Sequence, residues 1–190
     1  MSHFVDIGSL KEKVFILNNL ALSGELFSTS YFIGVSEFQK HYSDLDYHHF
    51  TKSIVSNYAI ELAVKLRNAS ELLQENKISY INDKNILCYG AGKQAGSENE
   101  EHDLFYICNK IIHAKKFRID TVGSAKYKVN FMWWNGYLTL AGTMAGKQQT
   151  PWEFFFSIQS WCESAIIFIN SCETSLSTIN MQSEDRAVYS

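Results

Sequence analysis

The chain has 190 residues, of which 46% are hydrophobic and 19% are charged, and its formal net charge at pH 7 is −3. A chain of this length and composition fits one globular domain and can bury a core without disulfides or metals. The slightly acidic balance gives no sign of the broadly basic surface that strong nucleic-acid binders carry.

The four cysteines, Cys88, Cys108, Cys162 and Cys172, form no C-x-x-C pair and have no zinc-ligand spacing. We therefore expect reduced thiols, no bound metal and no cofactor, as in a cytoplasmic protein. The first residues lack the charged and apolar stretches of a secretory signal, and no run approaches the roughly 18 apolar residues of a membrane helix. A soluble protein without a membrane partner is the expectation.

The first half of the chain has helical periodicity. Ser9-Leu10-Lys11-Glu12 matches a capping box, and apolar residues at helical spacing follow it. A second helix is predicted over about residues 50–74, with Lys65 outside its apolar stripe. The stripe consists of Ile54, Tyr58, Leu62, Leu66, Ala69 and Leu73.

Residues 82–102 are rich in glycine and then in acidic residues, which predicts a mobile loop. Asp103 is expected to cap the helix that follows this loop. The buried side of that helix is predicted to carry Leu104, Ile107, Cys108, Ile111 and Ile112.

Beyond residue 113 the apolar period changes to two, which predicts a four-stranded antiparallel meander over about 116–158. Asn135-Gly136 is expected to form a hairpin turn. The alternation places Trp133 in the buried set and leaves Trp134 and Phe155 outside it, where they could cover another helix or a partner subunit.

Two interpretations compete for residues 152–170. Pro151 could open a helix, or the alternating aromatic residues could form the last strand. We favour the strand, followed by a short helix that begins at the capping box Ser160–Glu163 and ends near Asn170. Residues 172–190 would be a loosely held polar tail. The predicted fold is therefore α+β: one domain over 1–171 with a helical bundle, a C-terminal β-meander and a final short helix.

One segment of the third predicted helix carries chemistry. Cys108-Asn109-Lys110-Ile111-Ile112-His113-Ala114 resembles the R-N-x-x-x-H helix of HEPN domains (higher eukaryotes and prokaryotes nucleotide-binding). It is similar, more closely, to a group of prokaryotic proteins of unassigned function that carry C-N-K-I-I-H-A. The similarity spans seven residues at the motif, with looser support from about Ser53 to Asn170. It implies a HEPN-like bundle, often a homodimer whose motif helices meet at a shared cleft.

Active HEPN members are metal-independent ribonucleases, in which the arginine stabilises phosphate charge and the histidine moves a proton near the ribose 2′-hydroxyl. Asn109 and His113 match the motif and stand four residues apart, on one helix face. Cys108 occupies the arginine position, and a neutral thiol cannot bind phosphate as a guanidinium does. A replacement cation would have to come from Lys110, from the lysines after the motif, or from Arg67, if it lies beside His113.

Two functions follow from these residues. The first is a non-catalytic or regulatory HEPN-like module that binds RNA, a nucleotide or a protein partner, with Lys110, Cys108 and Arg67 as binding residues. The alternative is a metal-independent ribonuclease of defence or toxin type, with His113 as acid and base and Asn109 orienting the substrate. Asn109 and His113 can equally be structural, as hydrogen-bond partners of neighbouring helices. The cysteine and the acidic balance favour the binding module.

Overall fold

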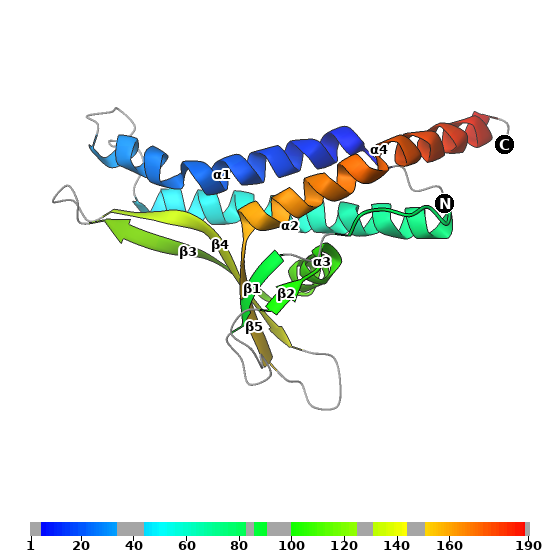
Figure 1. The fold of residues 1–190 in the computed structure, drawn as a ribbon. Coiled ribbons are helices and arrows are strands. Elements are labelled where there is room, and N and C mark those ends of the chain that lie inside the picture. The colour runs from blue at the N-terminus through cyan, green and yellow to red at the C-terminus, as the bar shows by residue number, and fades with distance from the viewer. Residues whose placement is uncertain are drawn as a thin grey trace.

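The computed structural model describes residues 5–33, 44–82, 86–90, 100–124, 131–143 and 151–188. These residues form four helices and one five-stranded sheet, which confirms the predicted α+β class (Figure 1). The helices are α1 (Ile7–Ile33), α2 (Asp44–Glu75), α3 (Leu104–Ile112) and α4 (Ile158–Val188). The strands are β1 (Ile86–Gly90), β2 (Glu100–His102), β3 (Lys116–Ser124), β4 (Phe131–Thr143) and β5 (Pro151–Ser157).

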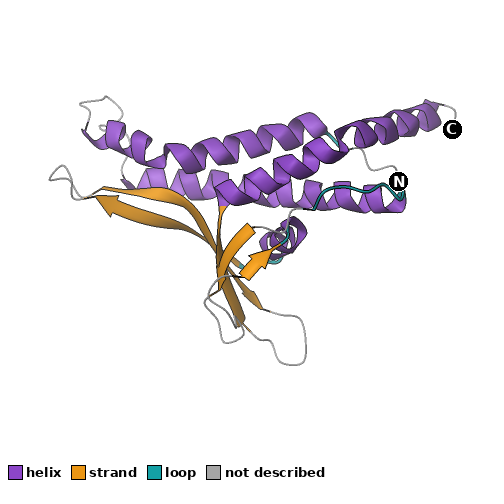
Figure 2. Ribbon diagram, viewed as in Figure 1, coloured by secondary structure: helices purple, strands orange, loops and turns teal. Residues whose placement is uncertain are grey.

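The three long helices α1, α2 and α4 lie together in one layer, and the sheet and α3 lie on one side of that layer (Figure 2). The strand order is β2-β1-β5-β4-β3, and all neighbours are antiparallel. Strands β3, β4 and β5 are consecutive in both chain and sheet, so the predicted meander is present, but with three described strands where four were predicted. The ends of the predicted 82–102 loop form β1 and β2 instead, while residues 83–85 and 91–99 lie outside the described part.

The predicted hairpin turn at Asn135-Gly136 is wrong, because β4 continues through both residues. Gly136 has a φ of +85°, and the register between β3 and β4 shifts between Ile119 and Thr121. The extra residues of β4 therefore form a bulge opposite Asp120. Positive φ suits a bulge as well as a tight turn, so the dipeptide alone does not distinguish the two.

The bulge region also reverses the predicted positions of the two neighbouring tryptophans. Trp134 is fully buried, with its indole Nε1 donating to the Tyr137 carbonyl oxygen at 2.7 Å, whereas Trp133 is only half-buried. The main chain of Trp134 lies against Gly24 of α1. A side-chain carbon at position 24 would collide with the carbonyl oxygen of Trp134. Trp134 thus lies beneath a helix, and α1 packs closely on β4 because position 24 has no side chain.

The predicted short final helix and polar tail are wrong, because α4 extends for 31 residues to Val188. It begins after Ser157, whose hydroxyl accepts the Ser160 amide at 3.3 Å, so the capping box at Ser160 does not start the helix. Near its end, the Asn180 side chain is buried and hydrogen-bonds both the main-chain N–H and the carbonyl of Val5, at 3.2 and 2.9 Å. These bonds attach the expected tail to the N-terminal segment.

The first helix begins two residues earlier than its predicted cap. The Asp6 carboxylate accepts the Ser9 amide at 2.9 Å, so Asp6 caps α1 and the predicted capping box at Ser9 is wrong. Helix α2 begins at Asp44 rather than near residue 50. Along its predicted stripe, Ile54 is 40% exposed and the neighbouring Val55 is buried instead.

Candidate functional site on helix α3

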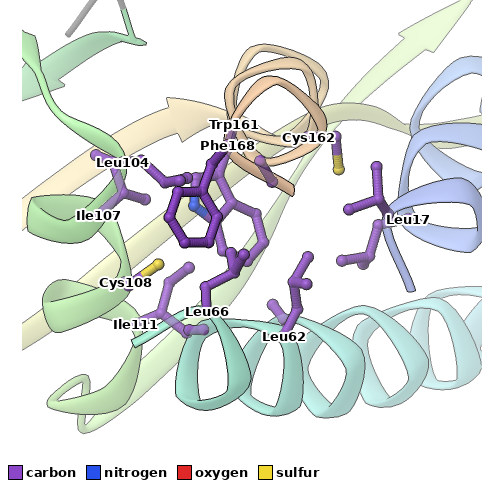
Figure 3. Packing of buried hydrophobic residues seen from close by; sticks show 14 of the residues in the cluster. Leu17, Leu62, Leu66, Leu104, Ile107, Cys108, Ile111, Trp161, Cys162 and Phe168 are labelled. Atoms are coloured by element: carbon purple, nitrogen blue, oxygen red, sulfur yellow. The ribbon is translucent and has the colours of Figure 1, made fainter. Parts of the chain in front are cut away.

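Helix α3 forms as predicted because its start is capped and one of its faces is apolar. The Asp103 carboxylate accepts the Tyr106 amide at 2.8 Å. The buried face packs against α2 and α4 (Figure 3). It consists of Leu104, Ile107, Cys108 and Ile111, and Ile112 is half-buried beside it. With this face in the core, Asn109 is left exposed on the other side of the helix.

Cys108, at the position where HEPN motifs carry arginine, lies in the core beside Trp161 (Figure 3). Burial raises the pKa of its thiol to about 12, although the Trp161 indole and the charge of Arg67 act in the opposite direction. The thiol is therefore neutral at physiological pH and has no exposed surface. Cys108 packs α3 against the bundle and does not line a surface site.

Arg67 reaches the motif from α2. Its Nη1 donates to Asn109 Oδ1 at 2.5 Å, and its Nη2 donates to Glu71 Oε1 at 2.9 Å. The Arg67 guanidinium thus contacts Asn109, which precedes His113 by one helical turn. The side chain of Arg67 is 36% exposed, so the cation remains accessible to a solvent-borne ligand.

His113 ends α3 and is exposed. Its main-chain N–H donates to the Asn109 carbonyl oxygen at 3.1 Å, and it serves as the C-cap of the helix. Within the described part of the chain, no hydrogen bond or ion pair involves its imidazole. Two residues later, the Lys115 amide donates to the Ala141 carbonyl at 2.8 Å, which attaches the end of the motif to β4.

The side chain of Lys110 lies against aromatic rings of β5 and α3 and not beside Arg67. Its ammonium lies 4.4 Å from the ring centroid of Trp152 on β5 and 5.2 Å from that of Tyr106. Loss of solvent around this half-buried side chain lowers the pKa of the amine. One residue turns an α-helix by about 100°, so Lys110 lies against the sheet while the exposed Asn109 meets the end of the Arg67 side chain. Lys110 and Arg67 therefore do not converge.

The local charges favour an anion over the exposed side of α3. Arg67 lies on the motif, and the exposed Lys115 and Lys116 follow it directly in the chain. Against these three cations are two carboxylates, those of Glu71 beside Arg67 and of Asp103 at the opposite end of α3. A guanidinium and a side-chain amide are donors that suit phosphate oxygens. The partial negative charge at the end of α3 opposes this preference, so the cations are needed to offset it.

A second polar cluster, between α1 and α2, was not predicted. Glu61 Oε1 accepts from Lys13 at 2.9 Å and from Lys65 at 2.8 Å, and both ammonium groups also donate to Ser9 Oγ. The side chain of Lys13 is only 7% exposed. The Glu61–Lys65 pair follows from its i,i+4 spacing, but the sequence carries no signal for Lys13, which belongs to the neighbouring helix.

Comparison with protein-family models, with curated proteins and with solved structures finds no match to this chain. The described side chains include no group of three or more His, Cys, Asp or Glu residues that could hold a metal ion. Among the helices that the structure describes, none is both long and apolar enough to cross a membrane.

Proposed function

We propose that the exposed side of α3 is an RNA-binding site in a HEPN-like module, formed by Asn109 and His113 together with Arg67 of α2. The observation that carries this proposal is the hydrogen bond from Arg67 to Asn109. It brings a guanidinium to a motif whose own arginine position is a buried cysteine. The cation comes from a neighbouring helix instead of from the motif.

The exposure of this hydrogen bond supports a ligand site more than a structural one. A solvent-exposed charged pair contributes only about 0–1 kcal/mol to stability, so holding α2 against α3 does not require it. A guanidinium has five N–H donors, and Arg67 uses two of its nitrogens for Asn109 and Glu71. Donors remain for a phosphate, and the Asn109 amide can donate beside them.

RNA fits the distribution of charge better than a mononucleotide does. Lys115 and Lys116 continue the positive charge beyond His113, so a ligand with several phosphates can contact more than one cation. Each phosphate contact releases counterions, so the affinity is expected to fall steeply as salt is raised. In a protein of net charge −3, binding should be weak outside this surface.

Fluorescence anisotropy with a labelled single-stranded RNA tests the site. Arg67→Gln removes the charge and keeps most of the side-chain length, and we expect roughly tenfold weaker binding, or about 1.4 kcal/mol. Lys52→Gln, an exposed cation 15 residues earlier on α2 and so about 22 Å away along the helix, is the matched control. Equal affinities for the two variants would rule out Arg67 as a phosphate ligand.

A metal-independent ribonuclease is the second candidate, and the exposure of His113, one helical turn after the Asn109 that Arg67 contacts, favours it. In such cleavage the ribose 2′-oxygen attacks the adjacent phosphorus and its proton passes to an imidazole. The 5′-oxygen then leaves with a proton, and a 2′,3′-cyclic phosphate remains. Cleavage of a mixed RNA pool in EDTA that is lost in His113→Ala would support this activity. If carefully purified native protein leaves the RNA intact, the ribonuclease candidate is excluded and the binding module remains.

A further inference from the structure

Helix α1 is apolar on two opposite sides, and the described part of the chain covers one of them. Leu10 and Leu17 on the inner side are fully buried. On the outer side, Phe15 is 67% exposed, Leu22 is 61% exposed and Leu26 is 72% exposed. A helix that is apolar all round is normally surrounded on all sides, so the outer side is expected to have a partner.

The exposed residues follow the spacing of a helix–helix seam. Phe15, Asn19, Leu22 and Leu26, which we call the outer stripe, are separated by four, three and four residues. This is the a/d spacing of a heptad, in which side chains pack into the spaces of a second helix with the same spacing. The exposed Asn19 takes one of these positions, and its Nδ2 already donates to the Phe15 carbonyl oxygen at 2.7 Å, so the amide would enter the seam with a hydrogen bond.

We propose that two copies of this chain associate through their outer stripes, with the two α1 helices antiparallel about a two-fold axis. Phe15 and Leu26 lie at equal distances from the middle of the stripe, as do Asn19 and Leu22. An antiparallel pair therefore places Phe15 beside the partner subunit's Leu26, so one patch is complementary to itself.

The acidic residues along the stripe favour the antiparallel arrangement. Glu12 lies seven residues before Asn19 on the same line of the helix, and Glu25 lies beside Leu26; both are exposed. In a parallel pair each carboxylate would lie close to its own copy. In the antiparallel pair Glu12 and Glu25 lie away from the equivalent residues of the second chain, which avoids like-charge repulsion.

The exposed apolar area approaches the size that a dimer needs. At roughly 200 Å² for a large apolar side chain, the exposed fractions of Phe15, Leu22 and Leu26 leave roughly 400 Å² per copy. A patch of this size lies within the roughly 300–600 Å² range of the largest patch on a typical monomer, which is often functional. Two copies would cover roughly 800 Å², and the flanking side chains bring the total toward the ~1,000 Å² of a specific interface.

This dimer would leave the two α3 sites separate. Gly24, on the side of α1 opposite Leu22 and Leu26, packs on β4, so the outer stripe faces away from the layer that contains α3 (Figure 1). The HEPN resemblance implies motif helices that meet at a shared cleft. Pairing through α1 instead keeps each Arg67–Asn109 site open to solvent, and it does not depend on the proposed function.

Size-exclusion chromatography with light scattering on the full chain at tens of micromolar tests the proposal. We expect twice the chain mass of 21.8 kDa for the native protein and the single mass for Leu22→Glu. Ile81→Glu, at a loop residue that is 57% exposed, should remain dimeric. Leucine and glutamate are both good helix formers, so far-UV circular dichroism should be unchanged. A monomeric native protein, or a dimeric Leu22→Glu variant, would overturn the proposal.

Cross-linking tests the orientation without relying on a disruptive variant. Proteins with Phe15→Cys or with Leu26→Cys are oxidised separately and as a mixture, with the native protein as background. The antiparallel pair predicts disulfide-linked dimers only in the mixture, because each residue lies far from its own copy. Links within either single variant would show a parallel pair and contradict the proposal. A native monomer that sediments with phospholipid vesicles would assign the outer stripe to a lipid surface instead.

Discussion

Replacing Gly24 with alanine tests the close packing of α1 on β4. The added methyl group would collide with the carbonyl oxygen of Trp134 and lie 3.4 Å from the Trp133 ring. The carbonyl oxygen belongs to the main chain of a sheet strand and cannot move aside as a side chain can. The collision is therefore removed only if α1 and β4 move apart. Overpacking of this kind costs about 1–3 kcal/mol. Alanine in place of glycine in a helix contributes up to about 1 kcal/mol in the opposite direction. We expect a net loss of about 1–2 kcal/mol.

Thermal unfolding of Gly24→Ala measures this loss. For a chain of this size, about 1 kcal/mol shifts the melting temperature by roughly 2–4 °C, so a decrease of about 2–8 °C is expected. Gly8→Ala in the same helix is the control, because Gly8 is exposed and its nearest obstacle, Asp6 Oδ1 at 3.3 Å, is the end of an exposed side chain that can shift by a few tenths of an ångström. Its melting temperature should be unchanged or higher. A Gly24→Ala protein as stable as Gly8→Ala would refute the close packing of α1 on β4.

Two further substitutions and one labelling experiment test other parts of the structure. Asn180→Ala removes two buried hydrogen bonds and should cost about 1–3 kcal/mol in urea unfolding; an unchanged midpoint would mean that the end of α4 is not docked. Hydrogen bonds from Lys65 and Lys13 lower the pKa of Glu61 in the folded protein. The Glu61 carboxylate therefore stabilises the fold fully above pH 4.5, its pKa in the unfolded chain, and this stabilisation is lost as the pH falls through the lowered pKa of the folded protein. The stability difference between native protein and Glu61→Gln should therefore shrink on acidification, and a pH-independent difference would contradict the pairing. Burial raises the pKa of the Cys108 thiol to about 12, so maleimide should label it only after denaturation, as read by peptide mass spectrometry; rapid labelling of the folded protein would show that it is accessible.

The sequence predicted those elements whose local pattern and burial agree. Helix α3 has a capping aspartate at 103 and a narrow apolar face, and both appear in the structure. In β5 the alternation of Phe154 and Phe156 with Phe155 gave the correct buried face. Each of these elements packs one face against the core, so the spacing of apolar residues in the sequence matches the spacing of buried residues in the structure.

The elements that were mispredicted depend on contacts made by distant parts of the chain. At Gly136, a turn and a bulge need the same positive φ, and the choice depends on pairing with β3. Between Ser171 and Met181, where the structure describes its side chains, α4 buries only Cys172, Leu176 and Asn180, which gives a weak apolar stripe. Its docking partners include Val5, at the other end of the chain.

The candidate site shows the same division. The spacing of Asn109 and His113 predicted that they share a helix face, and Arg67 was one of the candidates for the cation that Cys108 cannot supply. The contact between Arg67 and Asn109 spans 42 residues and arises from the packing of α2 on α3. The orientation of Lys110 was not predictable, because its aromatic neighbour Trp152 comes from β5.

A titration of ¹⁵N-labelled protein with a short single-stranded RNA, followed by two-dimensional NMR, tests the proposed site most directly. We predict that the largest shifts appear at the Asn109 side-chain amide, at Arg67 Nε and at the amides from His113 to Lys116, and that raised salt reverses them. Shifts confined to the aromatic surroundings of Lys110, or no shifts at all, would contradict the assignment of the exposed side of α3 as the RNA-binding site.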